Sequence, residues 1–314
     1  MGDGVKPEPV SAPVARLAKG LKLGAGSLLV TMYGDVIAPR PQAPWLGSLI
    51  DLSAPFGLSN RLVRTAIFRL AADDWLEATK IGRKSFYGLS EAGLLRVQHA
   101  GKRIYAGVSP AWDGKWTLVM LRNDTKASMR QHLRRELLWE GFGPVAPGVF
   151  AHPNADSASL AEIIEAAGAI EHAAVMQAES VATFSRRPLE LLIHQTYRLK
   201  EVAQAWQAYV KRFAPWIDEA ASLSPADAFF VRILLIHEYR RVLLRDPGLP
   251  DELLPADWPG REARASTATL YAALLPASEA HLREYMETEA GEFRAPGRLL
   301  ESRFSSRFSS RLRG

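Results

Sequence analysis

The chain has 314 residues, of which 47% are hydrophobic and 23% charged, a composition typical of a soluble globular protein with two or three domains. It contains no cysteine, which excludes disulfides, thiolate nucleophiles and zinc–thiolate sites and suits a reducing cytoplasm. No apolar stretch reaches the roughly 20 residues of a membrane span, and no signal peptide is recognisable, so we expect a cytoplasmic protein. The formal net charge is only +5, but nine basic residues fall between Arg61 and Arg103 against four acidic ones. This local excess fits a polyanionic partner, and on charge alone it fits an ordinary solvated surface equally well.

The first 105 residues predict a basic arm followed by a small helical domain. Residues 1–24 are rich in Gly, Pro, Ala and Lys without periodicity, which indicates a mobile arm. Over residues 25–105 we expect a helix from near Ser27, a second helix Trp45–Leu52, a turn, and a third helix Asn60–Ala72 capped by Ser59. Two strands, Trp75–Lys80 and Ser85–Leu89, and a last helix to Tyr105 follow. This order is typical of a winged helix-turn-helix domain.

The third helix predicts a DNA-reading surface. Its apolar side chains Val63, Ala66, Ile67 and Leu70 recur at helical spacing, which leaves a polar opposite face. A helix with an apolar back and a polar front suits the major groove, where arginine binds guanine and apolar groups touch the thymine methyl. Basic residues at the hairpin tip would contact phosphates or the minor groove. The candidate DNA-binding residues are Ser59, Asn60, Arg61, Arg64, Thr65, Phe68, Arg83 and Lys84. The alternative is a small helical domain that serves protein interactions.

Beyond a linker at residues 106–115, the pattern changes twice. Residues 116–184 read as strand, helix, strand, strand, helix, strand, which is the ferredoxin-like βαββαβ order. Residues 185–290 are helical, with predicted helices Leu189–Phe213, Pro225–Leu244, Arg261–Leu275 and Glu279–Ala290. Residues 291–314 form a basic tail that repeats Ser-Arg-Phe-Ser at 302–305 and 306–309, and we expect this tail to be disordered. The fold class is therefore multidomain α+β.

Several motifs in a fixed order resemble one known family. They are Gly57-Leu58-Ser59, Val63-Arg64-Thr65-Ala66, Gly82-Arg83-Lys84-Ser85, Trp139-Glu140-Gly141-Phe142-Gly143, His237-Glu238-Tyr239-Arg240-Arg241 and Asp257-Trp258-Pro259-Gly260. These runs resemble the PaaX-like repressors of phenylacetate catabolism, over residues 25–285. The resemblance implies a winged helix, a central domain like that of the CRISPR-associated Cas2 proteins, and a helical C-terminal domain. It also implies a homodimer that represses a catabolic operon on double-stranded DNA and is released by an aryl-CoA such as phenylacetyl-CoA.

The effector site is the least defined part of this interpretation. An acyl-CoA pocket needs basic groups for the phosphates and an apolar slot for the acyl group. The candidate ligand-binding residues are Trp139, Tyr197, Arg198, Trp206, His237, Arg240 and Arg241, although aromatic residues at helical spacing are more often core. Where the family is expected to carry a Trp-Asp pair, this chain has Tyr197-Arg198, which leaves the acyl group open.

The sequence favours a regulator without a resident cofactor over an enzyme. His237-Glu238 lacks the second histidine of a zinc-protease motif, because Arg241 stands in its place. A Cas2-like nuclease would need a carboxylate at the end of its first strand to hold a metal, but that strand runs into Leu121-Arg122. We therefore expect neither a metal nor catalysis. The alternative is an enzyme acting on CoA thioesters or nucleic acid, with the winged helix as an accessory.

Overall fold

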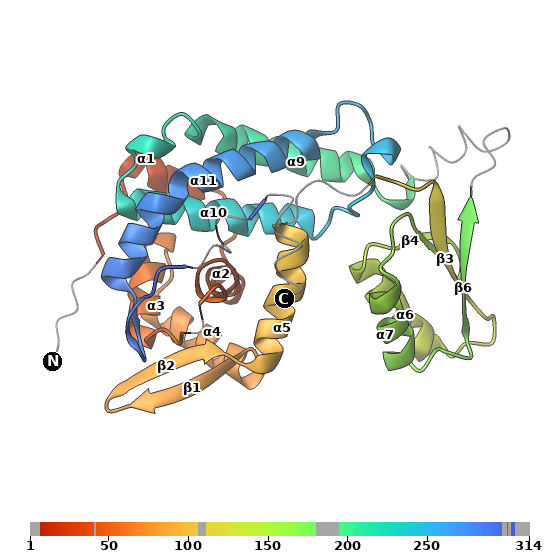
Figure 1. The fold of residues 1–314 in the computed structure, drawn as a ribbon, viewed down its shortest axis with the longest axis horizontal. Coiled ribbons are helices and arrows are strands. Elements are labelled where there is room, and N and C mark those ends of the chain that lie inside the picture. The colour runs from red at the N-terminus through yellow and green to blue at the C-terminus, as the bar shows by residue number, and fades with distance from the viewer. Residues whose placement is uncertain are drawn as a thin grey trace. The chain divides into compact units, whose positions relative to one another are not determined.

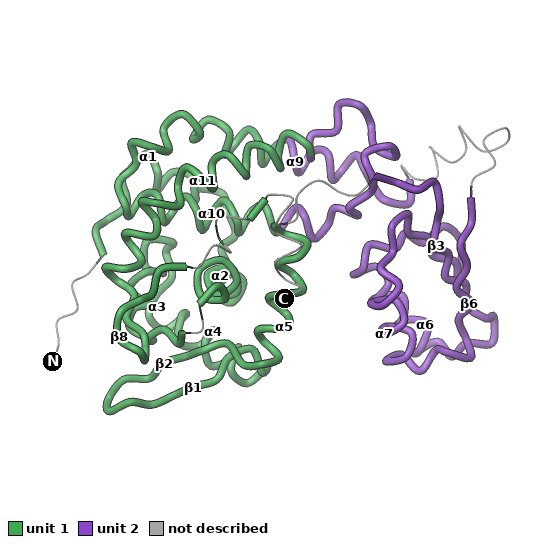
Figure 2. Tube along the Cα trace, viewed as in Figure 1, with its two compact units in different colours: residues 1–108, 208–240, 261–314 green, residues 109–207, 241–260 purple. Residues whose placement is uncertain are grey.

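The chain forms two compact units, and each unit is built from segments that are not consecutive in the sequence. The computed structural model describes residues 7–40, 42–105, 111–179, 195–296, 300 and 303–304. Unit 1 comprises residues 1–108, 208–240 and 261–314, and unit 2 comprises residues 109–207 and 241–260 (Figure 2). Residues 106–110 of the predicted linker and 189–194 of a predicted helix lie outside the described residues.

The N-terminal part of unit 1 has the predicted order of elements (Figure 1). Short α1 (Ala12–Ala15) precedes α2 (Ala25–Met32), which continues into a π-helical segment, Tyr33–Ile37. The remaining elements are α3 (Leu46–Ser53), α4 (Asn60–Ala72), β1 (Leu76–Ile81), β2 (Lys84–Leu89) and α5 (Glu91–Ile104).

Local sequence explains the bounds of α4 and of the hairpin. The Ser59 hydroxyl accepts a hydrogen bond from the Leu62 amide, which caps the first turn of α4. The β1–β2 register runs from Leu76 opposite Leu89 to Ile81 opposite Lys84, so the hairpin turns within two residues. Gly82, the first of these, has a φ of +59°, a conformation that glycine adopts without steric cost.

The C-terminal helices of unit 1 share its core with the N-terminal helices. In α10 (Pro225–Leu243) the residues from 226 to 237 are all buried, and most of them are apolar, so the core surrounds this helix on every side. Phe56, which precedes α4, stacks on Phe230 at 4.5 Å between ring centroids. The predicted border between residues 25–105 and 185–290 therefore does not separate two compact bodies. None of the helices in the described part of the chain is both long and apolar enough to cross a membrane.

One predicted helix break is wrong. We expected separate helices at 261–275 and 279–290, but α11 (Pro259–Tyr285) runs through Pro276 without interruption. Proline removes one backbone hydrogen bond from a helix interior. The following turn is nevertheless held in place because Ser278, Glu279 and Leu282 are buried. A short hairpin, β7 (Glu287–Thr288) with β8 (Gly291–Glu292), follows α11.

The expected mobile arm and disordered tail are wrong for several residues. In the arm, Val14 and Leu17 are buried, and the Ser11 amide donates to the Asp227 carboxylate over 2.8 Å. In the tail, Leu300 and Arg303 are buried. Composition alone predicted disorder, because the partners of these residues lie more than 200 positions away for the arm and up to about 270 for the tail.

Unit 2 contains the predicted βαββαβ arrangement. Its elements are β3 (Lys115–Leu121), α6 (Ala127–Trp139), β4 (Gly143–Ala146), β5 (Val149–His152), α7 (Ser157–Ala166) and β6 (Ala173–Glu179). The sheet order is β4-β5-β3-β6 with antiparallel neighbours, which is the ferredoxin-like topology. Val119, Leu133 and Phe150 lie in the core between sheet and helices. Helix α9 (Leu199–Phe213) begins in unit 2 and ends in unit 1.

Candidate functional site

Helix α4 presents the predicted polar face to solvent. Arg61, Arg64, Thr65 and Phe68 are all exposed, and Phe68, although aromatic, is 55% exposed. The Arg64 Nε donates to the Asn60 side-chain oxygen over 2.6 Å, which holds this guanidinium over the first turn of the helix. The apolar residues of the opposite face are buried. The surface therefore combines cations with one large apolar group on a rigid support.

The two cations at the hairpin tip differ in their surroundings. Arg83 lies in the turn and is exposed. Lys84 is the first residue of β2, and its Nζ lies 2.7 and 2.6 Å from the two carboxylate oxygens of Glu287. The same Nζ lies 4.4 Å from the ring centroid of Trp45. The charge of Lys84 is therefore already balanced by a carboxylate from β7, whereas contact of both cations with DNA stays a prediction.

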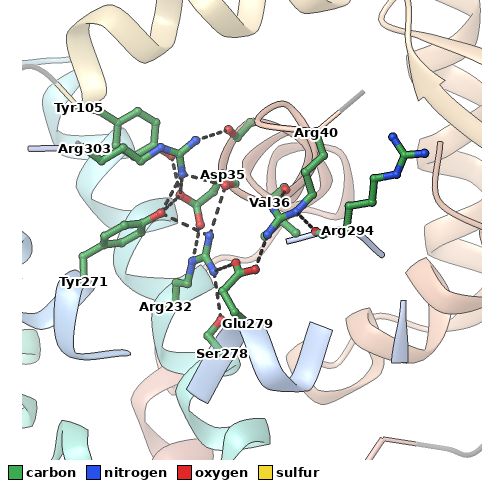
Figure 3. Close-up of polar contacts among 11 residues, drawn as sticks. Asp35, Val36, Arg40, Tyr105, Arg232, Tyr271, Ser278, Glu279, Arg294 and Arg303 are labelled. Atoms are coloured by element: carbon green, nitrogen blue, oxygen red, sulfur yellow. Dashed lines mark hydrogen bonds and ion pairs between the residues drawn. The ribbon is translucent and has the colours of Figure 1, made fainter. Parts of the chain in front are cut away.

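A network of buried polar side chains surrounds Asp35 in unit 1 (Figure 3). Asp35, in the π-helical segment that continues α2, is 0% exposed. Its carboxylate accepts from Arg232 Nε of α10 over 2.7 Å and from Arg303 of the tail. The hydroxyls of Tyr105 and Tyr271 donate to the same carboxylate over 2.7 and 3.0 Å. One carboxylate thus joins four distant segments of the chain.

Glu279 of α11 forms the second acidic centre of this network. Arg232 Nη1 lies 2.7 Å from one of its oxygens, and Arg40 forms an ion pair with the other. Arg40 also donates to the Arg294 carbonyl over 2.7 Å, and its guanidinium stacks at 4.3 Å on the ring of Phe293. Burial, only partly offset by Glu279, lowers the pKa of Arg40 to about 10. The arginine therefore remains charged at neutral pH.

The network keeps its charges because they compensate one another. Burial alone would raise the pKa of Asp35, but the Arg232 and Arg303 cations outweigh it, so that the pKa lies below its ordinary value. A charge pair of this kind adds little net stability relative to an apolar core, whereas removal of one partner is costly. Because α2 packs against α4, the network also fixes the support of the exposed helix.

Comparison with known proteins agrees with this architecture. Three family models match: PaaX-like protein over residues 24–93, the central Cas2-like domain of PaaX protein over 109–189, and the PaaX-like protein C-terminal domain over 197–284. The transcriptional repressor PaaX of Escherichia coli (strain K12) is 38% identical over 282 residues, which cover 88% of this chain and 89% of the relative. The chain belongs to the PaaX family. The resemblance predicted from the motifs is thereby confirmed.

The PaaX match also accounts for unit 2. Its Cas2-like central domain covers residues 109–189, which include the complete β3–β6 sheet. An uncharacterised protein from Mycobacterium tuberculosis has the same fold, with a TM-score of 0.52 and 24% identity. This likeness covers 82% of our chain and 98% of the mycobacterial one, and at this identity it concerns the fold alone.

The predicted effector residues are divided between the two units, and two of those in unit 2 are buried. The Tyr197 hydroxyl donates to the Ala151 carbonyl over 2.7 Å, and the Trp206 indole donates to the Asp246 carboxylate over 2.6 Å, both within buried surroundings of unit 2. Burial raises the pKa of Tyr197 well above its ordinary value and outweighs the opposing backbone hydrogen bond with Gly143, so the hydroxyl remains protonated. These two aromatic residues are parts of a core.

The other predicted effector residues divide between core and surface. His237 is buried, with its Nδ1 3.0 Å from the Thr31 hydroxyl, and half-buried Arg240 donates to the Ser27 hydroxyl over 2.9 Å. Trp139 is exposed, and the exposed Arg198 pairs with Glu201. Arg241 is half-buried in unit 2. In the described residues, no group of three or more acidic or histidine side chains is arranged to hold a metal ion.

Sequence reasoning missed the network, although one signal was present. Arg232 interrupts the run Phe229-Phe230-Val231 and Ile233-Leu234, and a lone cation inside an apolar helical run indicates a buried charge with a partner. Its partners Asp35 and Glu279 could not be identified from their own neighbourhoods, because they lie 197 and 47 residues away.

Proposed function

We propose that this protein is a transcriptional repressor that binds operator DNA through a winged helix made of α3, α4 and the β1–β2 hairpin. The observation that supports this most directly is the α4 face, where Arg61, Arg64, Thr65 and Phe68 project from a helix with a buried apolar back. A helix of this kind enters the major groove, where an arginine binds guanine through two hydrogen bonds. The relative from Escherichia coli is a transcriptional repressor, which supports the same assignment here.

The repressor binds its operator as a homodimer and is released by an effector. Helix-turn-helix repressors read two half-sites related by two-fold symmetry, so a dimer gains affinity without new types of contact. The effector is an acyl-CoA thioester, with phenylacetyl-CoA as the first candidate because of the PaaX relationship. Trp139 and Arg198, being exposed, are better placed to meet such a ligand than the buried Tyr197 and Trp206.

Substitution of the two hairpin cations should give unequal results. Each phosphate contact removed lowers the slope of log K against log salt by about 1. We expect Arg83→Ala to weaken binding to operator and scrambled DNA alike and to show this loss of slope. Lys84→Ala should change the slope by less than half as much, because Glu287 already neutralises that ammonium group. Fluorescence anisotropy over a salt series measures both, and equal slopes for the two variants would contradict the assignment.

Phenylacetyl-CoA should release the repressor from its operator. A ligand weakens DNA binding only if it prefers the conformation that holds DNA poorly, and the coupling is reciprocal. We expect it to raise the operator dissociation constant by about 5–150-fold, with operator weakening binding of the CoA ester by the same factor. Free phenylacetate, which lacks the phosphates, should do much less.

The titration is run on the protein–operator complex with phenylacetyl-CoA, other acyl-CoAs, free CoA and phenylacetate. Release by a different acyl-CoA would keep the mechanism and change the pathway, as the Tyr197-Arg198 pair allows. If no CoA ester releases the protein from operator DNA, the proposed acyl-CoA effector is wrong. DNA and thioester are recovered intact from a repressor, whereas an enzyme would consume one of them.

A further inference from the structure

The tail residue Phe304 sits among three tyrosine rings of unit 1. Its ring centroid lies 5.4 Å from that of Tyr105, 5.5 Å from Tyr271 and 5.9 Å from Tyr239. The interplanar angles of 79°, 63° and 77° are those of edge-to-face pairs, which aromatic rings favour. The Phe304 amide also donates to the Tyr105 carbonyl over 3.0 Å. These contacts form a slot for one phenyl ring.

The preceding residue, Arg303, fills the polar half of the same site. Its guanidinium contacts the Asp35 carboxylate and donates to the Asp35 carbonyl over 2.7 Å, the Tyr271 hydroxyl over 2.8 Å and the Gly34 carbonyl over 3.1 Å. It also stacks on the Tyr105 ring at 3.9 Å. Residues from four separate segments thus surround a single dipeptide.

The dipeptide is held by the site rather than by its own backbone preference. Phe304 has a φ of +62°, a left-handed conformation that non-glycine residues seldom adopt. Such a conformation persists where surrounding contacts determine it. Arg303 and Phe304 therefore behave as a tethered ligand of the unit to which they belong.

We propose that Asp35, Tyr105, Tyr239 and Tyr271 form a receptor site for an arginine–phenylalanine pair, which the chain fills with its own Arg303 and Phe304. Occupation of this site favours the DNA-binding conformation of unit 1. The receptor part stands on the contacts above, and the DNA-binding part rests on the proposed function.

Two residues of the receptor site, Asp35 and Tyr105, adjoin elements of the proposed DNA-binding domain. Asp35 directly continues α2, which packs against α4, and Tyr105 follows the last residue of α5. When the site is empty, Asp35 loses one of its two arginine partners, and the Tyr105 carbonyl loses the hydrogen bond from Phe304. The loss at Asp35 falls on the continuation of α2, which packs against α4, and α5 in turn packs against that continuation and β2. A filled site and a well-placed α4 therefore stabilise each other.

The repeated sequence supplies a matched control for the test. Ser-Arg-Phe-Ser occurs at 302–305 and again at 306–309, and the second copy lies outside the described residues. Arg303→Ala/Phe304→Ala and Arg307→Ala/Phe308→Ala remove the same groups and the same charge from the full-length chain. We expect the first variant to melt at a lower temperature and to bind operator about 5–150-fold more weakly. The second variant should match the parent in both measurements.

Rescue in trans separates a binding site from a merely structural contact. Acetyl-Glu-Ser-Arg-Phe-Ser-Ser-amide, added to the Arg303→Ala/Phe304→Ala variant, should bind by isothermal titration calorimetry and restore both melting temperature and operator affinity. A peptide with alanines in place of the Arg-Phe pair should do neither. Because the calorimetry contains no DNA, it tests the receptor site even if the protein proves not to bind operator.

Two results would overturn the proposal. One is an equal loss in the two double variants, which would indicate a general effect of tail charge. The other is a parent-like melting temperature even in the quadruple variant that lacks both Arg-Phe pairs. A loss confined to the quadruple variant would support the site and show that either copy fills it.

Discussion

Replacement of Arg232 by methionine should lower the free energy of unfolding of unit 1 by about 3–5 kcal/mol. Arg232 is fully buried and pairs with both acidic centres of the network, Asp35 and Glu279. Methionine fills similar space but leaves the two carboxylates with less compensation in a dry environment. Asp35 would keep Arg303, and Glu279 would keep Arg40, so we expect a destabilised unit and not merely a changed surface.

The matched control is Arg198→Met. Arg198 also pairs with a carboxylate, that of Glu201, but its side chain is 75% exposed. An exposed pair contributes about 0–1 kcal/mol, because water and salt screen it. Urea denaturation followed by hydrogen exchange on peptides from α2 and α10 reports on unit 1. Similar small effects of the two substitutions would show that the network is not the electrostatic centre described here.

Alanine at Arg61 or Arg64 should remove the preference for operator while leaving the fold intact. A bidentate contact between arginine and guanine contributes about 1–3 kcal/mol of discrimination. Both side chains are exposed on α4 and lie opposite its buried face, so truncation opens no cavity. We therefore expect the affinity for operator to fall towards that for scrambled DNA, with an unchanged melting temperature.

Arg135→Ala controls for the loss of one positive charge. Arg135 is 71% exposed on α6 of unit 2, away from the proposed reading helix in the sequence and in a different compact unit. Fluorescence anisotropy with operator and scrambled duplexes measures the discrimination of all three variants. If the Arg61 and Arg64 variants discriminate as well as the parent, another surface reads the bases.

Elements with local sequence signals could be predicted before the fold was known. The 3.6-residue recurrence of Val63, Ala66, Ile67 and Leu70, with the Ser59 cap, predicted α4 and its exposed face. The glycine turn at Gly82 predicted the hairpin. The alternation of strands and helices after residue 115 predicted the ferredoxin-like topology of unit 2. In each case the residues that predict an element lie within that element or directly beside it in the sequence.

Contacts between residues far apart in the sequence could not be predicted and became evident only in the folded chain. Composition marked residues 291–314 as disordered, yet Arg303 is buried against Asp35, 268 positions away. Pro276 indicated a break between two helices, yet α11 continues through it because the side chains of the next turn are buried. Nothing in the sequence around Lys84 indicates its ion pair with Glu287, 203 positions away. A buried charge is permitted only where an opposite charge or several hydrogen bonds meet it, and those partners are set by packing across the whole unit rather than by neighbouring sequence.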